Sequence, residues 1–334
     1  MDEPTSALTE SEIKELFATI NHLKKSGVSI IYISHRMDEL FEIGDEVTVL
    51  RDGRGVGTRL IEGTSRDELI RMMVNRELNE SFIREQPTLG GEVLKVENLS
   101  RQDCLSNISF ALQKGELVGI AGLLGAGRTE LARVLFGVDS TDSGVIHVHG
   151  HRCSINSPRE AINRGIGFLT EDRKSQGLVM NMSVKENISL PNLKRFSKWG
   201  VIDKQTEESI TDNYCRELDI KLTSLNQLAL NLSGGNQQKV VLSKWLCSQA
   251  DIFIFDEPTR GIDVGSKQEF YRLMNELTAG GAAIIVISSD LPELLSISDR
   301  ILVMHNRTIV EQFDRNEFDQ EQILFCALGG IGEA

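Results

Sequence analysis

The stretch LVGIAGLLGAGRTE, residues 117–130, sets an apolar run, a glycine-rich loop and the first turn of a helix in direct succession. A short continuous apolar run such as Leu117–Ala121 is typical of a strand buried on both faces of a sheet. Residues 122–129 match the pattern GxxxxGK[ST], except that Arg128 stands where the pattern has lysine. The sequence therefore predicts a strand–loop–helix unit whose backbone amides face phosphate.

Each part of this loop has a role in the predicted nucleotide site. Glycines let the backbone N–H groups turn inward, the helix N-terminus adds partial positive charge, and the Thr129 hydroxyl can bind Mg²⁺. Arg128 has a planar guanidinium in place of a compact ammonium, so we expect nucleotide binding to persist and γ-phosphate positioning to suffer. The expected contacts are Gly122, Leu123, Leu124, Gly125, Ala126, Gly127, Arg128 and Thr129.

A second apolar run, Ile252–Phe255, leads directly into Asp256 and Glu257. Such a strand delivers carboxylates to the end of a sheet. We expect Asp256 to hold Mg²⁺, directly or through water, and Glu257 to orient the water that attacks the γ-phosphate. The alternative, two acids that only cap the following helix, is disfavoured by the glycine loop upstream.

A long internal repeat defines the domain organisation. FDEPTRGID at 255–263 has a near copy, MDEPTSALT, at 1–9, and the same spacing pairs Gly27 with Gly281 without a gap. A repeat of this length indicates two copies of one domain. We expect residues 1–81 to be the C-terminal fragment of a first copy, 82–91 a linker and 92–334 a complete second copy. The first copy has no phosphate loop, so we expect an N-terminal truncation.

The periodicity predicts an α/β fold. In the first copy we expect a helix that ends at Gly27, a buried strand at 28–33, a helix near 37–43 and a strand at 47–50. In the second copy, buried strands alternate with helices, which predicts a mainly parallel central sheet. We expect strands of that sheet at 117–121, 166–169, 252–255 and 284–287, antiparallel strands at 93–96 and 108–112, and an inserted helical subdomain within 180–250.

Composition excludes several classes of protein. The net charge of −13 argues against sequence-independent binding of nucleic acid. No apolar run is long enough to cross a membrane, and no signal peptide is visible. The cysteines number 5 and are scattered, which fits a reducing compartment and no zinc site.

The segment LSGGNQQ at 232–238 resembles the signature of ABC-type ATPases. The resemblance implies the ABC form of the P-loop NTPase fold, with ATP and Mg²⁺ as ligands. It also implies that two domains sandwich two ATP molecules, so that the signature faces the nucleotide of the other domain. The residues it assigns to that contact are Ser233, Gly234, Gly235 and Gln237.

More narrowly, the chain resembles the fused double ATPase subunits of bacterial ribose- and galactose-type importers. The carrying segments are GLLGAGRTE at 122–130, TEDRKSQGL at 170–178, SVKENISL at 183–190, LSGGNQQK at 232–239, DEPTRGIDVG at 256–265 and YISHRMDELFEI at 32–43. The resemblance implies a peripheral ATPase on the cytoplasmic face of the bacterial inner membrane. Its partners would be membrane permease subunits, which receive sugar from a periplasmic binding protein.

The resemblance also assigns roles to single residues. His35 falls at the position of the switch histidine, and its equivalent in the second copy is Ser289. Glu171 falls where a glutamine usually senses Mg²⁺ and contacts the permease. The strong site of such subunits would combine the first copy's phosphate loop, Glu3 and His35 with the Ser233 segment. The second copy's own site therefore looks degenerate at Arg128, Glu171 and Ser289.

Three functions are open on the sequence. The first is a transport ATPase subunit that works only within a complete complex. The second is a truncated remnant that binds nucleotide, hydrolyses it poorly and acts as an interaction module. Self-pairing of the second copy, with its signature supplied in trans, is another way to complete a site. The third, a soluble ABC-type ATPase acting on DNA or ribosomes, predicts coiled coils or basic segments that the sequence lacks.

Overall fold

The computed structural model describes residues 1, 4–5, 10–34, 37–51, 54–65, 68–69, 72, 88–123 and 125–329. The chain divides into two compact units. The first unit comprises Met1–Ser81 with Gly261–Glu269, and the second comprises Phe82–Arg260 with Phe270–Ala334.

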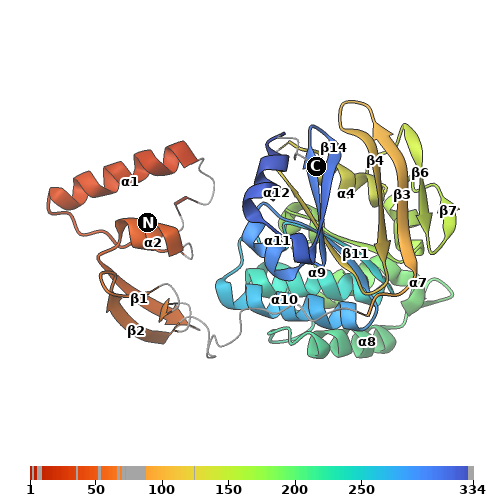
Figure 1. The fold of residues 1–334 in the computed structure, drawn as a ribbon. Coiled ribbons are helices and arrows are strands. Elements are labelled where there is room, and N and C mark those ends of the chain that lie inside the picture. Colours follow the sequence, from red (N-terminus) through yellow and green to blue (C-terminus); the bar gives the residue numbers. More distant parts are fainter. Residues whose placement is uncertain are drawn as a thin grey trace. The chain divides into compact units, whose positions relative to one another are not determined.

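The described part of the first unit includes helices α1 and α2 and a hairpin. Helix α1 (Glu10–Lys25) and helix α2 (Met37–Ile43) precede the antiparallel strands β1 (Glu46–Arg51) and β2 (Arg54–Leu60) (Figure 1). The apolar face of α1 is buried through Phe17 and Ile20 against Ile43 of α2. The predicted helices near 13–27 and 37–43, and the predicted strand at 47–50, are therefore confirmed.

The segment 28–33 is extended but is not the buried strand that its apolar composition predicts. Ile31 is 82% exposed, and Val28 and Ile33 are also exposed. The Met1 amino group donates to the Ile31 carbonyl and the Ile33 N–H donates to the Met1 carbonyl, each at 2.9 Å. Burial on both faces requires a covering layer on each side, and in the described part of this unit only one face of 28–33 is covered, where Ile30 and Tyr32 pack on α1 and α2. The prediction of a buried strand is wrong for that reason.

The second unit is built on a six-stranded sheet whose order is β14-β13-β5-β12-β11-β8. All neighbours are parallel except the edge strand β14, which is antiparallel to β13. The strands are β5 (Leu117–Gly122), β8 (Ile166–Leu169), β11 (Ile252–Asp256), β12 (Ala283–Ile287), β13 (Arg300–His305) and β14 (Thr308–Asp314). The mainly parallel sheet is confirmed, whereas the last two strands were not among the predicted ones.

An antiparallel layer adjoins this sheet, as predicted. Its strand order is β4-β3-β6-β7. The strands are β3 (Glu92–Arg101), β4 (Leu105–Gln113), β6 (Ser143–Val148) and β7 (His151–Cys153). Apolar residues of both layers, such as Leu94, Ile108, Phe253 and Ile285, belong to one continuous buried core.

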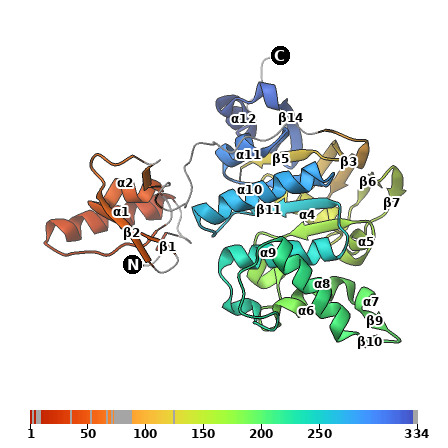
Figure 2. The ribbon, with the colours of Figure 1, turned by 90° about the horizontal axis from the view of Figure 1, so that it is seen from below.

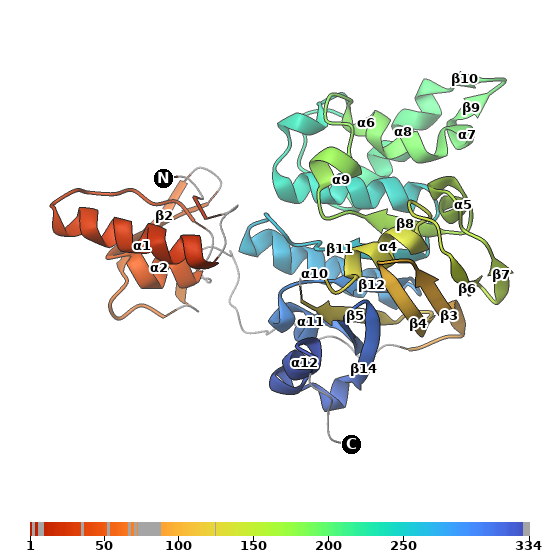
Figure 3. The ribbon, with the colours of Figure 1, turned by 90° about the horizontal axis from the view of Figure 1, so that it is seen from above.

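Helices surround the two sheets. Helix α4 (Arg128–Leu135) follows β5, and the predicted helical insertion, with α9, lies at one end of the unit, away from α11 and α12 (Figures 2 and 3). The remaining α-helices are α5 (Pro158–Asn163), α6 (Val184–Ser189), α7 (Leu193–Phe196), α8 (Lys204–Glu217), α9 (Gly234–Cys247), α10 (Val264–Ala279), α11 (Leu291–Ile297) and α12 (Gln320–Ala327). Within the described ranges, none of the helices combines the length and the apolar content that crossing a bilayer requires.

The same buried hydrogen-bond network occurs once in each unit. In the second unit the Glu293 carboxylate accepts from the Thr259 hydroxyl at 2.9 Å and from the Ser288 hydroxyl at 2.6 Å. In the first unit the Glu39 carboxylate accepts from the Thr5 hydroxyl at 2.6 Å and from the Ser34 hydroxyl at 2.7 Å. These three pairs of residues are matched by the sequence repeat. Each network ties the loop after DEPT to the loop after the following apolar run.

Two glycines with the same backbone conformation test the packing of the second unit. Gly137 and Gly150 have φ angles of 73° and 74°. A Cβ on Gly137 would lie 2.7 Å from the Ser157 carbonyl oxygen, whereas a Cβ on Gly150 would meet nothing within 4 Å. Gly150→Ala should cost about 1 kcal/mol for the left-handed backbone alone. Gly137→Ala should cost about 1–3 kcal/mol more, because it adds overpacking.

The comparison is made on midpoints of urea unfolding of the full chain. The Gly150→Ala variant is the matched control for backbone strain. Equal midpoints for the two variants would contradict the close packing described for Gly137.

Candidate functional site

The glycine loop lies where β5 meets α4. A Cβ on Gly122 would lie 2.6 Å from the Met304 carbonyl oxygen, so the end of β5 tolerates only glycine. Gly127, with φ of 101°, is the N-cap of α4, and no side chain caps this helix. Gly125 is exposed, and a Cβ there would meet nothing within 4 Å. The loop thus presents an uncapped helix N-terminus, the local arrangement that suits a bound anion. Leu124 lies outside the described residues.

Asp256 ends the apolar strand β11 and is almost completely buried, with 1% of its surface exposed. Neither of its carboxylate oxygens has a hydrogen-bond partner among the described residues. Burial raises the pKa of Asp256 to about 6, and the nearby Thr129 hydroxyl and Arg128 charge offset part of that rise. A buried, unpartnered carboxylate is costly unless a cation or a proton compensates it.

These residues fit a magnesium ion. Mg²⁺ binds proteins through one or two carboxylates together with hydroxyl groups, water and phosphate oxygens. The two buried carboxylate oxygens of Asp256 accept no hydrogen bond from the described residues, and the Thr129 hydroxyl lies beside them. The donor set is therefore of the right chemistry, and it lies next to the first turn of α4.

Glu257 follows Asp256 and is held in an unusual backbone conformation. Its φ is 48°, in the left-handed region that residues with a Cβ rarely adopt. Its N–H donates to the Ile287 carbonyl at 2.8 Å, and its own carbonyl accepts from the Arg260 N–H at 3.1 Å. Strained backbone of this kind persists only where the surroundings hold it, and it is common at functional sites.

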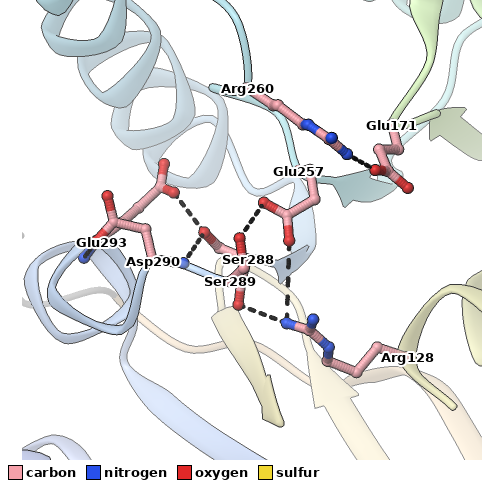
Figure 4. A network of polar contacts seen from close by, with 8 residues as sticks. All are labelled: Arg128, Glu171, Glu257, Arg260, Ser288, Ser289, Asp290 and Glu293. Carbon is pink, nitrogen blue, oxygen red and sulfur yellow. Dashed lines mark hydrogen bonds and ion pairs between the residues drawn. The ribbon is translucent and has the colours of Figure 1, made fainter. Parts of the chain in front are cut away.

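The side chains of Arg128 and Glu257 meet beneath the loop (Figure 4). The Arg128 guanidinium is buried, donates to the Ser288 carbonyl at 2.7 Å and lies 4.0 Å from the Glu257 carboxylate. The Ser289 hydroxyl donates to the other Glu257 oxygen at 3.1 Å. Burial raises the pKa of Glu257, while Arg128 and Ser289 counteract the rise. Both polar neighbours therefore stabilise the ionised form of this carboxylate.

Glu171 lies just after β8 and forms an ion pair with Arg260, which follows the acidic turn (Figure 4). The neighbouring Arg173 donates to the Arg260 carbonyl at 3.0 Å and to the Gln237 side-chain oxygen at 3.3 Å. Glu171 is thus engaged by a partner at the rim of the site. Arg260 and Arg173 were not among the predicted site residues, because a charged residue in a loop carries no signal for its partner.

The signature segment forms the N-terminus of α9. Ser233 is the N-cap and is exposed, with Gly234 and Gly235 in the first turn. Gln237, by contrast, is buried, and its amide donates to the carbonyls of Ala229 at 3.1 Å and Leu232 at 3.3 Å. The geometry leaves Ser233 and the two glycines open to a ligand and gives Gln237 a supporting position behind them.

Helix α9 is also tied to the acidic turn. The Gln238 amide donates to the Pro258 carbonyl at 2.7 Å, and both groups are buried. Glu3 and His35, the expected catalytic residues of the first copy, lie outside the described residues. The structure assembles residues 122–123, residues 125–129, Asp256 and Glu257 at one end of the second unit's sheet.

Comparison with known proteins gives a consistent family. The family model for the ABC transporter matches residues 105–260. The chain is 52% identical over 330 residues to the ribose import ATP-binding protein RbsA of Bacillus licheniformis and 50% identical to that of Bacillus subtilis. Each alignment covers 99% of this chain and 67% of the relative, so the chain spans about two thirds of the length of these relatives.

Solved structures share the fold. The ADP conformation of MJ1267, an ATP-binding cassette of an ABC transporter, matches with a TM-score of 0.60 at 22% identity. That alignment covers 72% of this chain and 96% of the other. The structure of cbiO1 from Clostridium perfringens, part of the ABC transporter complex cbiONQ, matches with a TM-score of 0.59 at 22% identity, covering 72% of this chain and 95% of that one. The predicted ABC ATPase fold is confirmed.

The buried carboxylate of Asp256 predicts a specific pH dependence of stability. Its pKa in the folded chain is about 6, against an ordinary value of 3.8. Between these values the folded chain holds a proton that the unfolded chain releases, so stability falls as pH rises through this window. Asp256→Asn cannot ionise and should be more stable than the unaltered chain by about 2–3 kcal/mol at neutral pH, at roughly 1.4 kcal/mol per pKa unit.

The measurement is urea unfolding of both chains without nucleotide or metal, at neutral pH and at a pH near that of free aspartate. The extra stability of Asp256→Asn over the unaltered chain should vanish at the acidic pH. An advantage independent of pH would show that Asp256 does not ionise in this environment.

Proposed function

This chain belongs to the ATP-binding proteins of sugar-importing ABC transporters, and we propose that it energises import of a monosaccharide through membrane permease subunits. The observation that carries the proposal is the buried carboxylate of Asp256 beside Thr129, at the first turn of the uncapped helix α4. The relatives are named for ribose import, which makes ribose the first sugar to test.

In this proposal different residues of the second unit bind the phosphates of ATP, hold Mg²⁺ and orient the attacking water. Loop amides of 122–129 bind the phosphates, and the N-terminus of α4 contributes favourable partial charge. Asp256 and Thr129 would hold Mg²⁺, which neutralises developing charge on the phosphates when it is bound. Glu257 would orient the attacking water. The uncapped loop and the unpartnered carboxylate support the ligands ATP and Mg²⁺.

The domain organisation follows from the repeat. We infer that residues 1–81 belong to a first cassette copy, 82–91 to a linker and 92–334 to a second copy. The matching networks of Glu39 and Glu293 support this inference, because two buried carboxylates receive the same hydroxyl donors at repeat-related positions.

The proposed role in sugar import also implies the partners and the location of the chain. We infer a peripheral position at the cytoplasmic face of the inner membrane, on permease subunits supplied by a periplasmic sugar-binding protein. Ser233, Gly234 and Gly235 would face a nucleotide held by another cassette copy. Glu3 and His35 would act at that site, as the resemblance assigns them. Self-pairing of this chain through its signature is the alternative source of the second copy.

One observation favours slow hydrolysis at the site of the second unit. The Arg128 guanidinium donates to the Ser288 carbonyl and approaches the Glu257 carboxylate. The Arg128 guanidinium is held by Ser288 and Glu257, so its charge is not free to follow the γ-phosphate. In addition, Ser289 offers only a short hydroxyl at the position that the resemblance assigns to a switch histidine. The contacts of Arg128 therefore favour the interpretation that the isolated chain binds nucleotide and hydrolyses it slowly.

We therefore expect weak ATP hydrolysis by the purified chain and a gain in the Arg128→Lys variant. Lysine carries its charge on a compact ammonium at the end of a flexible stem, in place of the guanidinium nitrogen that contacts both Ser288 and Glu257, so its charge can follow the phosphate. Phosphate release with Mg²⁺ and ATP should rise about 5–10-fold, which corresponds to about 1–1.4 kcal/mol of transition-state stabilisation. Adding Glu257→Gln to this variant should remove the gain.

The control for this experiment is nucleotide binding, measured with a fluorescent ATP analogue, which Arg128→Lys should preserve. Strong Mg²⁺-dependent turnover by the unaltered chain, abolished by Glu257→Gln alone, would contradict the proposed role of Arg128.

The proposed transport role predicts an association with permease subunits. A tagged, detergent-solubilised permease of a ribose importer should retain the chain at least tenfold above an unrelated membrane protein, a difference of about 1.4 kcal/mol. Glu171→Arg should weaken retention, because it breaks the pair with Arg260 at the loop that the resemblance assigns to permease contact.

The matched change for that experiment is Glu208→Arg, which makes the same charge reversal on the exposed side of α8. Retention that is equal for permease and unrelated protein would refute the transport role. Equal losses in both variants would refute the assignment of the contact to the Glu171 loop.

A further inference from the structure

A short hairpin of the helical insertion carries a tryptophan at its tip. Strands β9 (Ser197–Lys198) and β10 (Val201–Ile202) pair antiparallel and are joined by Trp199 and Gly200, both with positive φ. Trp199 is fully exposed, at 103% of its reference area. Tryptophan has an intermediate tendency to be buried and is highly buried on average, so a fully exposed one is unusual. Figure 3 shows the hairpin at the outer end of the insertion, beyond α7 and α8.

Two further exposed apolar side chains, Val201 and Ile202, lie on this hairpin. We call these two residues together with Trp199 the hairpin patch. Exposed apolar side chains gathered on one short element mark an interaction surface more often than isolated ones do.

The charges around the hairpin patch are opposite in sign to those of the whole chain. Between Leu193 and Lys204 the sequence holds the basic residues Lys194, Arg195, Lys198 and Lys204 and a single acidic residue, Asp203, whereas the chain as a whole has a net charge of −13. Lys194, Arg195 and Lys204 are exposed. The Asp203 carboxylate accepts hydrogen bonds from Thr206 and Gln205 as the cap of α8, and the Arg195 guanidinium donates to the Cys247 carbonyl at 2.9 Å, which leaves Lys194 and Lys204 as the basic side chains used to test the patch.

We propose that the hairpin patch docks on the anionic headgroup surface of a phospholipid bilayer. Tryptophan is favoured at the boundary between headgroups and acyl chains, because its ring is apolar and its N–H can still donate. Lysine and arginine beside it are attracted to anionic lipids. The hairpin patch ends in a two-residue turn at the outer end of the insertion, which fits a deformable planar surface. A folded protein partner would have to supply a matching socket.

The net negative charge does not oppose this contact strongly. Electrostatic interactions are screened beyond about 8 Å at physiological ionic strength, so the lipid surface senses mainly the basic residues near the tip. A patch of this size binds weakly by itself. The inference rests on the proposed function, because weak binding is sufficient only if the chain is already near the membrane. A permease embedded in the bilayer would hold the chain there and raise the effective concentration of lipid.

The two tryptophans of the chain provide a direct test. Trp245 is buried on α9 against Phe136, with ring centroids 5.4 Å apart, whereas Trp199 stands free. In a Trp245→Phe chain the fluorescence reports Trp199 alone, and in a Trp199→Phe chain it reports Trp245 alone. The probe is protein-free vesicles of equal parts phosphatidylglycerol and phosphatidylcholine, with brominated acyl chains as quenchers.

We expect a blue shift and quenching of Trp199 with these vesicles, and no change for Trp245. Vesicles of phosphatidylcholine alone should bind at least tenfold more weakly, as should the Lys194→Glu, Lys204→Glu double variant. The Lys114→Glu, Lys221→Glu double variant makes the same change of charge at exposed positions outside the hairpin and should bind as the unaltered chain does.

Three outcomes would overturn the proposal. One is an unchanged Trp199 spectrum with anionic vesicles, and another is equal quenching of both tryptophans. The third is binding that requires permease in the vesicles, which would make the partner a protein. Nucleotide binding measured in solution on the same variants separates this inference from the proposed function, because it does not depend on lipid.

Discussion

The site of this protein depends on a carboxylate that the fold buries without a hydrogen-bond partner among the described residues. Asp256 occupies the last position of a strand whose other residues are all buried and apolar. Its register beside Ile287 of β12 places it deep enough to lose water and close to the first turn of α4. Burial raises the pKa of this carboxylate to about 6, so at neutral pH the fold carries the cost of a buried, ionised group that a cation would relieve.

Around this carboxylate, the loops that follow β5, β11 and β12 converge because parallel strands end at the same edge of a sheet. Arg128 comes from the first loop, Glu257 from the second and Ser288 from the third, and the three are joined in one network. A substitution of lysine by arginine is conservative in charge, but the longer planar group reaches the Ser288 carbonyl.

The sequence alone was sufficient for much of this fold, for identifiable physical reasons. Leu117–Ala121 and Ile252–Phe255 are continuous apolar runs, and only strands covered on both faces need such composition. The same reasoning failed at 28–33, because in the described structure α1 and α2 cover only one face of this segment and the other face is exposed. Strand β13 was not predicted although its apolar run at 301–304 is as long as Ile252–Phe255, because it leads into no motif like the acids that follow the latter run.

Within the site, residue types were predictable and side-chain directions were not. The pattern at 122–129 and the acids at 256 and 257 locate the site, and Ser233 is open where the resemblance places a contact. The burial of Gln237 and the partners of Arg128 and Glu171 depend on carbonyls and charges far away in the chain. Hydrogen-bond partners of that kind are tertiary information, which no local pattern encodes.

The bond between the Gln238 amide and the Pro258 carbonyl has a consequence for how the two parts of the site can move. Pro258 directly follows Glu257, and Gln238 lies one turn into the helix that Ser233 begins. A displacement of that helix relative to the acidic turn by more than an ångström would break a buried bond, which costs about 1–3 kcal/mol. The helix and the turn are therefore expected to move together, so that binding at Ser233 would affect the position of Glu257.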